Sequence, residues 1–202
     1  AAEYRAAIIA LLAGLGLTTA FGASLGMPGL IAFVYIVLYL VINTAIAKIR
    51  AEAGAPTHGF HFAGPDHILL TVLGPNRMTT RQKASFALFF GFNRAYTGVP
   101  MPHQLEGMKM GEVLGVNQRR LTSALMLATI LGCSAGVWAL LHLCFREGVE
   151  QMGYPVHDLS PGGWQLVGSW LDNPPGPNWQ GMIGIVVGFL FASLLMAMRC
   201  RF

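Results

Sequence analysis

Four long apolar runs constrain the fold of this chain more than any other feature. They are Ala6–Leu25, Leu30–Ala47, Leu121–Phe145 and Met182–Met198. A membrane-spanning helix needs about 20 mostly apolar residues, within a range of about 17–25, and each run meets that length. Only 11% of the residues are charged, whereas soluble domains carry about 25%. The runs therefore predict an all-α, polytopic membrane helix bundle with about four full spans.

The runs divide the chain into five parts. Residues 1–49 are expected to form two transmembrane helices, and residues 121–145 and 181–202 one each. Between them lie a polar central region with re-entrant or broken helices (50–120) and an extracytoplasmic loop (146–180). The sequence begins without Met and ends at Phe202, directly after the last run. We therefore expect the chain to be one section of a longer protein.

Basic residues predict the orientation, because cytoplasmic ends of membrane helices are enriched in Lys and Arg. The cytoplasmic side is expected to hold Arg5, Lys48, Arg50, the Arg77–Lys83 cluster, Lys109, Arg119, Arg120, Arg199 and Arg201. Gly22–Gly29 and residues 146–180 are expected on the other side, which requires the central region to cross the membrane twice or not at all. The same enrichment accounts for the net charge of +4, so no nucleic-acid partner is expected.

The central region contains two apolar pieces, Ile68–Leu73 and Ala84–Phe92, that are each too short to span a membrane. They are compatible with a re-entrant hairpin, which is allowed at membrane depth where protein or water covers its backbone. Alternatively, Gln82–Val99 spans the membrane with Asn93 and Arg94 near its middle, where a charge is rare and usually functional. The third alternative is a cytoplasmic loop with two amphipathic segments.

Small residues recur at every fourth position in three of the apolar runs. The series are Ala6, Ala10, Gly14, Thr18 and Gly22; Ala124, Ala128, Gly132 and Gly136; and Gly184, Gly188 and Ala192. Residues four apart share one face of a helix, and small side chains let helix backbones approach closely. These series predict a tightly packed bundle. A similar series occurs in Gln104–Arg120. If this segment is helical, one of its faces carries no side chains at Gly107, Gly111 and Gly115 and can pack closely against another helix; the alternative is a flexible loop.

Histidines are concentrated at the start of the central region. His58, His61 and His67 lie near Asp66, and imidazole and carboxylate groups suit Zn, Fe or Mn. A metal site at these three histidines is one interpretation. The others are histidines that bond to the backbone of a loop and histidines that handle protons near neutral pH, because nearby Gly and Pro residues disfavour a helix that would align the imidazoles. No resident cofactor is expected.

Several charged or ionisable residues are candidates for a substrate or ion pathway. Glu52 follows the second apolar run, where an acid can accept a proton or bind a cation if burial raises its pKa. Its alternative role is an exposed pair with Arg50, which contributes little energy. The full candidate set is Glu52, Asp66, Arg94, His103, Glu106 and Lys109.

The central region resembles part of a known transporter family. The resemblance rests on Lys109-Met110-Gly111, Arg119-Arg120, the span with Thr129-Ile130-Leu131-Gly132, and the segments Arg50–Pro56 and Asn93–Gly107. Together they resemble the oligopeptide transporter superfamily and are similar to an uncharacterised bacterial branch related to it. The resemblance covers about positions 50–145. It implies movement of peptides or metal chelates, driven by protons, and it carries over no site residue.

We therefore expect a section of a proton-coupled secondary transporter in a bacterial inner membrane, and not an enzyme. The sequence contains no phosphate-binding loop that ends in Lys-Ser or Lys-Thr and no hydrolase motif. Expected partners are the lipid bilayer, protons, a peptide or metal chelate, and either further copies of the chain or the rest of the same protein. The alternatives are a histidine-rich membrane metalloenzyme and a structural subunit of a larger membrane complex.

Overall fold

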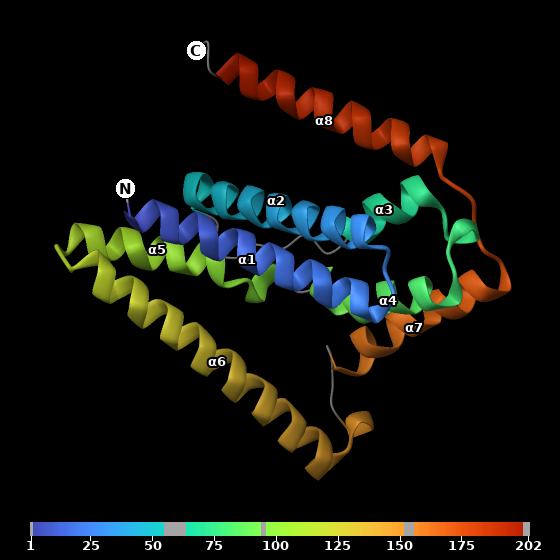
Figure 1. Ribbon diagram of the computed structural model, residues 1–202, viewed down its shortest axis with the longest axis horizontal. Helices are drawn as coiled ribbons and strands as arrows, with labels where there is room; N and C mark the ends of the chain where they lie inside the picture. Colours follow the sequence, from blue (N-terminus) through green and yellow to red (C-terminus); the bar gives the residue numbers. More distant parts are fainter. Residues whose placement is uncertain (1, 55–63, 94–95, 152–155, 200–202) are drawn as a thin grey trace.

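The computed structural model describes residues 2–54, 64–93, 96–151 and 156–199, and regular structure in these ranges is helical throughout (Figure 1). The α-helices are α1 (Ala2–Leu25), α2 (Gly29–Ala53), α3 (Pro65–Leu73), α4 (Thr80–Phe89), α5 (Pro100–Val113), α6 (Gln118–Glu147), α7 (Val156–Asp172) and α8 (Trp179–Arg199). Short 3-10 helices are η1 (Pro75–Arg77), η2 (Phe90–Asn93), η3 (Tyr96–Gly98) and η4 (Val149–Gln151).

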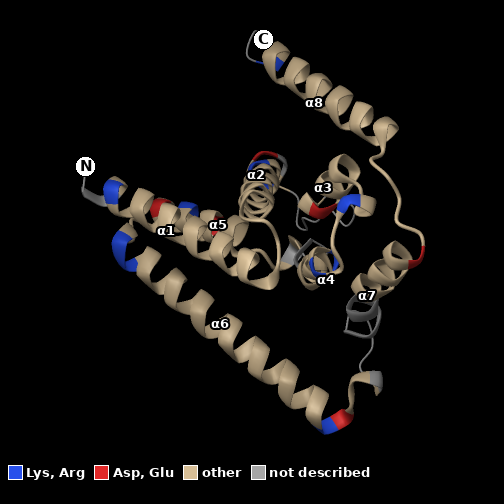
Figure 2. Ribbon diagram, turned by 45° about the vertical axis from the view of Figure 1, so that its right-hand side comes forward, with Lys and Arg blue, Asp and Glu red and all other residues tan. Residues whose placement is uncertain are grey.

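Four of these helices are long and apolar enough to cross a membrane. They correspond to Tyr4–Leu25, Gly29–Glu52, Gln118–Glu147 and Trp179–Arg199. Charged side chains lie mainly at the helix ends, and the stretches between them carry almost none (Figure 2). The predicted all-α membrane bundle with four full spans is confirmed.

Helices α1 and α2 form an antiparallel hairpin whose turn, Gly26–Pro28, defines one end of the bundle, which we call the turn end (Figure 1). The hydrophobic core lies near this end, where residues from the turn and from α2, α3, α4 and α7 pack together. Its buried members are Met27, Ala32, Tyr35, Leu69, Phe86, Phe89, Val167 and Trp170. The ring of Tyr35 lies 6.0 Å from Phe86 and 5.2 Å from Phe89 between ring centroids. This aromatic contact fixes α4 against α2.

The opposite end, which we call the basic end, contains the start of α1, the ends of α2, α5 and α8, and the start of α6. Arg50 of α2 pairs with Glu106 of α5, and Glu52 of α2 pairs with Arg199 of α8. Asn117 caps α6 by accepting the backbone N–H of Arg119 at 3.1 Å. Helix α2 is followed by Gly54, which has the left-handed conformation with φ +64°. Glycine adopts this conformation without steric cost.

Helices α4 and α5 together form a broken crossing of the bundle. Helix α4 begins at the turn end, where Ser85 donates a hydrogen bond to the carbonyl of Leu25 at 2.9 Å. Helix α5 reaches the basic end through Glu106. Their 10 and 14 residues correspond to a combined length of about 36 Å, close to the length of about 38 Å for the 25 residues of α2. The central region therefore contains the predicted broken helix, interrupted between Phe89 and Pro100.

The Arg77–Lys83 cluster lies at the turn end, so its predicted place beside the other basic residues is wrong. Arg81 donates to the carbonyl of Ser24 at 3.0 Å, and Lys83 donates to the carbonyl of Trp170 at 2.6 Å. Backbone carbonyls thus bind these two cations. The enrichment of Lys and Arg at cytoplasmic helix ends, from which their place was predicted, gives no information about such contacts. Arg50 and Lys109 both lie at the basic end, so the described parts of the central region reach both ends of the bundle.

Residues 146–180 contain a helix, α7, where the sequence analysis expects a loop. Two glycines of α7 are packing contacts. A Cβ on Gly163 would lie 3.0 Å from the carbonyl oxygen of Ala87, and one on Gly162 would lie 3.2 Å from the ring of Phe90. Glycine here permits close approach of α7 to α4 and η2.

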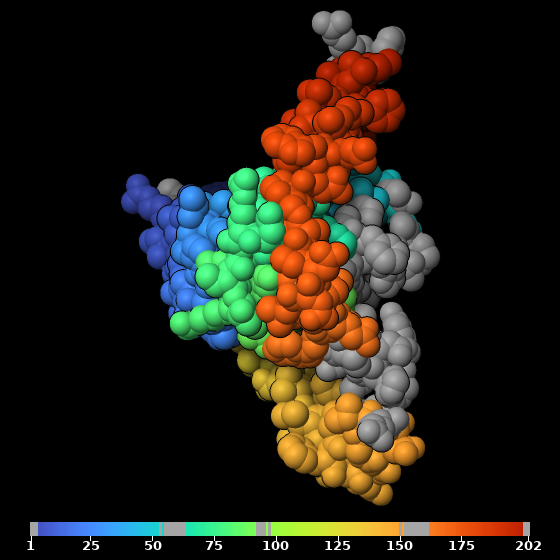
Figure 3. All heavy atoms as spheres, turned by 90° about the vertical axis from the view of Figure 1, so that its right-hand side faces the viewer, coloured from blue at the N-terminus to red at the C-terminus, as the bar shows by residue number. Residues whose placement is uncertain are grey.

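Helices α6 and α8 extend away from the body on opposite sides (Figure 3), and neither contains a buried residue. The glycine series of α6 and α8 have no neighbour within 4 Å of an added Cβ, so the predicted tight packing does not hold for them. The prediction holds for Gly107 and Gly111 of α5, but not for Gly115, because α5 ends at Val113 and Gly115 follows it with φ +69° and no close neighbour. A Cβ on Gly111 would meet the side chain of Leu121 of α6, and one on Gly107 would lie 3.4 Å from Leu125.

Replacing Lys83 with Met is expected to lower the stability of the protein by about 1.5–3 kcal/mol, the usual contribution of a hydrogen bond to a charged group. Lys83 is only 6% exposed, and its ammonium binds one of the last carbonyls of α7, where a cation also interacts favourably with the helix dipole. Thermal unfolding of the full-length protein in detergent measures the effect. The control is Arg81→Met, because Arg81 is exposed and binds a carbonyl in the same way. Equal shifts for the two variants would contradict the special role of Lys83.

Candidate functional site

The interruption between α4 and α5 lies beside the middle of α2. Tyr96 of η3 is buried, and its ring stacks on that of Tyr39 with 6.0 Å between centroids and 26° between planes. Asn43 follows one turn later on α2. It lies about 21 Å from the start of α2 and about 15 Å from its end, at 1.5 Å per residue. The break therefore adjoins a polar side chain near the midpoint of a candidate span.

Asn43 carries an unsatisfied acceptor at this position. The side chain is 4% exposed, and its amide nitrogen donates to the carbonyl of Tyr39 at 2.8 Å. Its carboxamide oxygen is buried and has no hydrogen-bond partner among the described residues. Leaving a buried acceptor unsatisfied costs about 1–3 kcal/mol, so such a group calls for an explanation. A donor or cation from a bound molecule would satisfy it.

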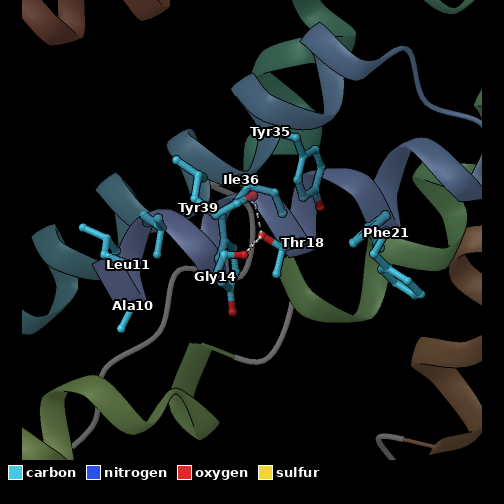
Figure 4. Close-up of a pocket in the computed structure, with 11 residues that line it drawn as sticks. Ala10, Leu11, Gly14, Thr18, Phe21, Tyr35, Ile36 and Tyr39 are labelled. Carbon is cyan, nitrogen blue, oxygen red and sulfur yellow. Dashed lines mark hydrogen bonds between the residues drawn. The ribbon is translucent and has the colours of Figure 1, made fainter. Parts of the chain in front are cut away.

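An apolar groove of about 420 Å³ lies next to the break, between α1, α2 and the last turn of α4 (Figure 4). The hydroxyl of Thr18 is one of its few polar groups, and it donates to the carbonyl of Gly14 at 2.8 Å within its own helix. The lining residues are Ala10, Leu11, Gly14, Leu15, Thr18, Phe21, Tyr35, Ile36, Tyr39, Leu40 and Phe89.

Ion pairs connect α2 to two other helices at the basic end. The guanidinium of Arg50 binds both carboxylate oxygens of Glu106, one of them at 2.9 Å. The side chain of Arg50 is 12% exposed and that of Glu106 46%. Arg199 donates to Glu52 at 2.7 Å, and both side chains are exposed. These contacts join α2 to α5 and to α8.

A third pair lies at the end of α5, outside the candidate spans. Lys109 donates to Glu112 at 2.7 Å, and this hydrogen bond holds the pKa of the Glu112 carboxyl below its ordinary value of 4.5. Both side chains are well exposed to solvent, so the pair contributes little to stability.

The structure brings only some of the predicted site residues together. Glu52, Glu106 and Lys109 take part in the three ion pairs, all at the basic end. Asp66 is buried in the first turn of α3, His67 is exposed next to it, and His103 is exposed on α5. Within the described residues, no three His, Cys, Asp or Glu side chains form a group that could hold a metal. His58, His61 and Arg94 lie outside the described residues, so the metal site stays a prediction.

Sequence reasoning missed Asn43, Tyr39 and Tyr96. Asn43 could have been found from the sequence, because it is a polar residue within an apolar run, and polar groups inside the membrane are usually functional. Nothing in the sequence distinguishes the two tyrosines. Their contact joins α2 to a segment more than fifty residues later, which the local pattern does not specify.

Comparisons with known proteins give one match. A family model described as "Family of unknown function (DUF6785)" matches residues 1–202. Neither the search of curated proteins nor that of solved structures found a match. Because the family model covers the whole sequence, the chain belongs to the family of unknown function DUF6785.

Proposed function

We propose that the chain is a membrane-embedded section of a secondary transporter whose cargo binds at the break between α4 and α5. Secondary transporters bind substrates and coupling ions near the bilayer midplane, where discontinuous helices leave backbone and side-chain polar groups available. The single observation that carries the proposal is the buried carboxamide oxygen of Asn43. It lies midway along a candidate span, beside a broken crossing, with no hydrogen-bond partner among the described residues.

The proposed cargo is a peptide or a metal chelate, moved with protons across a bacterial inner membrane. The resemblance to the oligopeptide transporter superfamily supports this cargo class and the proton coupling. The N–H groups of a peptide, or the cation of a chelate, match the acceptor on Asn43. Asp66 is the buried carboxyl group of the described region, and we assign it the role of proton acceptor.

Replacing Asn43 with Leu is expected to lower uptake at least about tenfold, because a lost hydrogen bond to a buried group of about 1.5 kcal/mol corresponds to that factor. Thermal stability of the same variant is expected to stay constant or rise, since the substitution removes an unsatisfied buried acceptor. The measurement uses full-length protein in proteoliposomes with an inward proton gradient. Trialanine and Fe(III)–citrate serve as the two cargo probes, and an internal pH dye reports proton entry.

Thr44→Val is the matched control for this experiment. Thr44 is the next residue on α2, is exposed, and donates its hydroxyl to the carbonyl of Leu40 at 2.8 Å within the helix. Its uptake is expected to equal that of the unmodified protein. Equal uptake by Asn43→Leu and Thr44→Val would rule out a role for Asn43 in transport. A parallel loss of uptake and thermal stability in Asn43→Leu would assign Asn43 a purely structural role.

A structural subunit of a larger membrane complex is the second candidate function. The observation that favours it is the large exposed apolar surface of α6 and α8, neither of which contains a buried residue, because such surfaces can pack against helices of other chains as well as against lipid. Stable co-purification with other chains, together with no movement of either cargo probe and no proton entry, would favour the subunit over the transporter.

A further inference from the structure

We propose that the apolar groove between α1 and α2 binds one acyl chain of an anionic phospholipid, with the headgroup at the basic end. The groove adjoins the site of the proposed function, but this inference does not depend on transport. It rests on the composition, length and location of the groove and on the charges beyond its end.

The composition of the lining fits hydrocarbon. All lining residues except Thr18, Tyr35 and Tyr39 are apolar. Thr18 directs its hydroxyl to the carbonyls of Gly14 and Leu15 in its own helix, as the dashed lines in Figure 4 show. The tyrosines contribute aromatic rings that already pack against other rings. A peptide bound along this surface would leave most of its backbone groups without partners, which is unfavourable, whereas an acyl chain has no such groups.

The length of the groove is close to half the thickness of the hydrocarbon core of a bilayer, and its lining on α1 extends across the middle of the candidate span Tyr4–Leu25. Along α1 its lining extends from Ala10 to Phe21, a distance of about 16 Å at 1.5 Å per residue. Half of the hydrocarbon core of a bilayer is about 15 Å. The α1 side of the groove is open, with Leu11 58% and Phe21 59% exposed. Since α1 is a candidate span, this open side faces the region where acyl chains lie.

Basic residues lie beyond the end of the groove at Ala10 and Leu40. Arg5 precedes Ala10 by about 7 Å along α1, and Lys48 follows Leu40 by about 12 Å along α2. Both are exposed, and neither forms an ion pair with a described residue. Basic groups at the level of the headgroups attract anionic lipids. The charges therefore match the phosphate of an anionic phospholipid whose acyl chain lies in the groove.

Two glycines of α1 provide a matched pair of variants, one that fills the groove and one that leaves it unchanged. Gly14 lines the groove, and Gly16 does not. An added Cβ at either position has no neighbour within 4 Å, so a side chain can begin at both positions without a clash at its first carbon. Gly14→Leu places its side chain in the groove, whereas Gly16→Leu adds the same atoms elsewhere on the same helix.

The experiment uses full-length protein in bilayers of phosphatidylcholine and phosphatidylglycerol. Either lipid carries, in turn, a photoactivatable diazirine at the middle of one acyl chain, and mass spectrometry locates the labelled residues. We expect the phosphatidylglycerol probe to label groove residues of α1 and α2 more strongly than the phosphatidylcholine probe. Gly14→Leu should reduce this labelling several-fold, and Gly16→Leu should leave it unchanged. Lys48→Gln should reduce the preference for phosphatidylglycerol.

Three results would overturn the proposal. Equal labelling of the groove in Gly14→Leu and Gly16→Leu would show that the probe does not enter the groove. Equal labelling by the two lipid probes would exclude selection of an anionic headgroup. No labelling of the groove in the unmodified protein would show that another helix or a second copy of the chain occupies it. Because uptake is not measured, none of these results bears on the transporter proposal.

Discussion

Gly74→Ala is expected to destabilise the protein more than an added methyl group at any other described glycine with positive φ. Gly74 follows α3 with φ +71° and ψ +128°, a conformation that side chains rarely adopt and that costs about 1–3 kcal/mol. An added Cβ would also lie 2.5 Å from the backbone nitrogen of Pro177 and 2.8 Å from the carbonyl carbon of Gly176. Backbone atoms cannot rotate away, so the segment before α8 would have to shift.

The contacts around Gly74 show what such a shift would break. The N–H of Asn76 donates to the carbonyl of Pro175 at 3.1 Å, and the N–H of Asn178 donates to the carbonyl of Thr71 at 2.9 Å. These two hydrogen bonds attach the start of α8 to α3 and η1. We expect Gly74→Ala to lose both and to cost more than about 3 kcal/mol in total, as strain and lost hydrogen bonds add.

Gly54→Ala is the control, and thermal unfolding of the full-length protein in detergent is the measurement. Gly54 also has positive φ, at +64°, but an added Cβ has no neighbour within 4 Å. Its cost is expected to be limited to the penalty of the left-handed conformation, about 1–2 kcal/mol. If both variants unfold at the same temperature, the close contact with Pro177 has no energetic weight and this interpretation fails.

Arg50→Glu is expected to abolish uptake by the full-length protein, and the double variant Arg50→Glu with Glu106→Arg is expected to restore most of it. The pair is bidentate, and its arginine is nearly buried. The planar guanidinium fits a carboxylate in this geometry, so the hydrogen bonds are charge-assisted and strong. Reversing one charge places two carboxylates together on α2 and α5, which separates the second half of the broken crossing from α2.

Glu112→Lys is the control for charge reversal. It changes an exposed pair within α5, so its uptake is expected to stay near that of the unmodified protein. The measurement is the same proteoliposome assay, with trialanine and Fe(III)–citrate as probes and protein insertion checked by immunoblot. Failure of the double variant to recover, with normal insertion, would show that the identity of each residue matters rather than their pairing.

The spans could be predicted from the sequence because apolar length alone determines them, and α1, α2, α6 and α8 follow the apolar runs closely. The place of the interruption between α4 and α5 was not foreseeable. The two short apolar pieces, Ile68–Leu73 and Ala84–Phe92, correspond to α3 and to α4 with η2, and the alternative of one continuous span over Gln82–Val99 is wrong because α4 ends at Phe89. The location of the Arg77–Lys83 cluster was not foreseeable either. Its cations bind carbonyls of Ser24 and Trp170, and those carbonyls come from remote helices that no local pattern specifies.

The candidate site was less predictable than the fold. Glu52 and Glu106 were visible as acids at helix ends, but their partners Arg199 and Arg50 depend on how the helices assemble. Asn43 was visible as a polar residue in an apolar run. Its importance appeared only with the burial of its oxygen beside the break, which is a property of the tertiary structure.

Different kinds of interaction stabilise the two ends of the bundle. The turn end is held by hydrogen bonds to backbone carbonyls, including those that Lys83, Arg81 and Ser85 donate. The basic end is held by pairs of opposite charges, which dissolved ions weaken. Higher ionic strength is therefore expected to weaken the contacts of α2 with α5 and α8 at the basic end more than the backbone hydrogen bonds at the turn end.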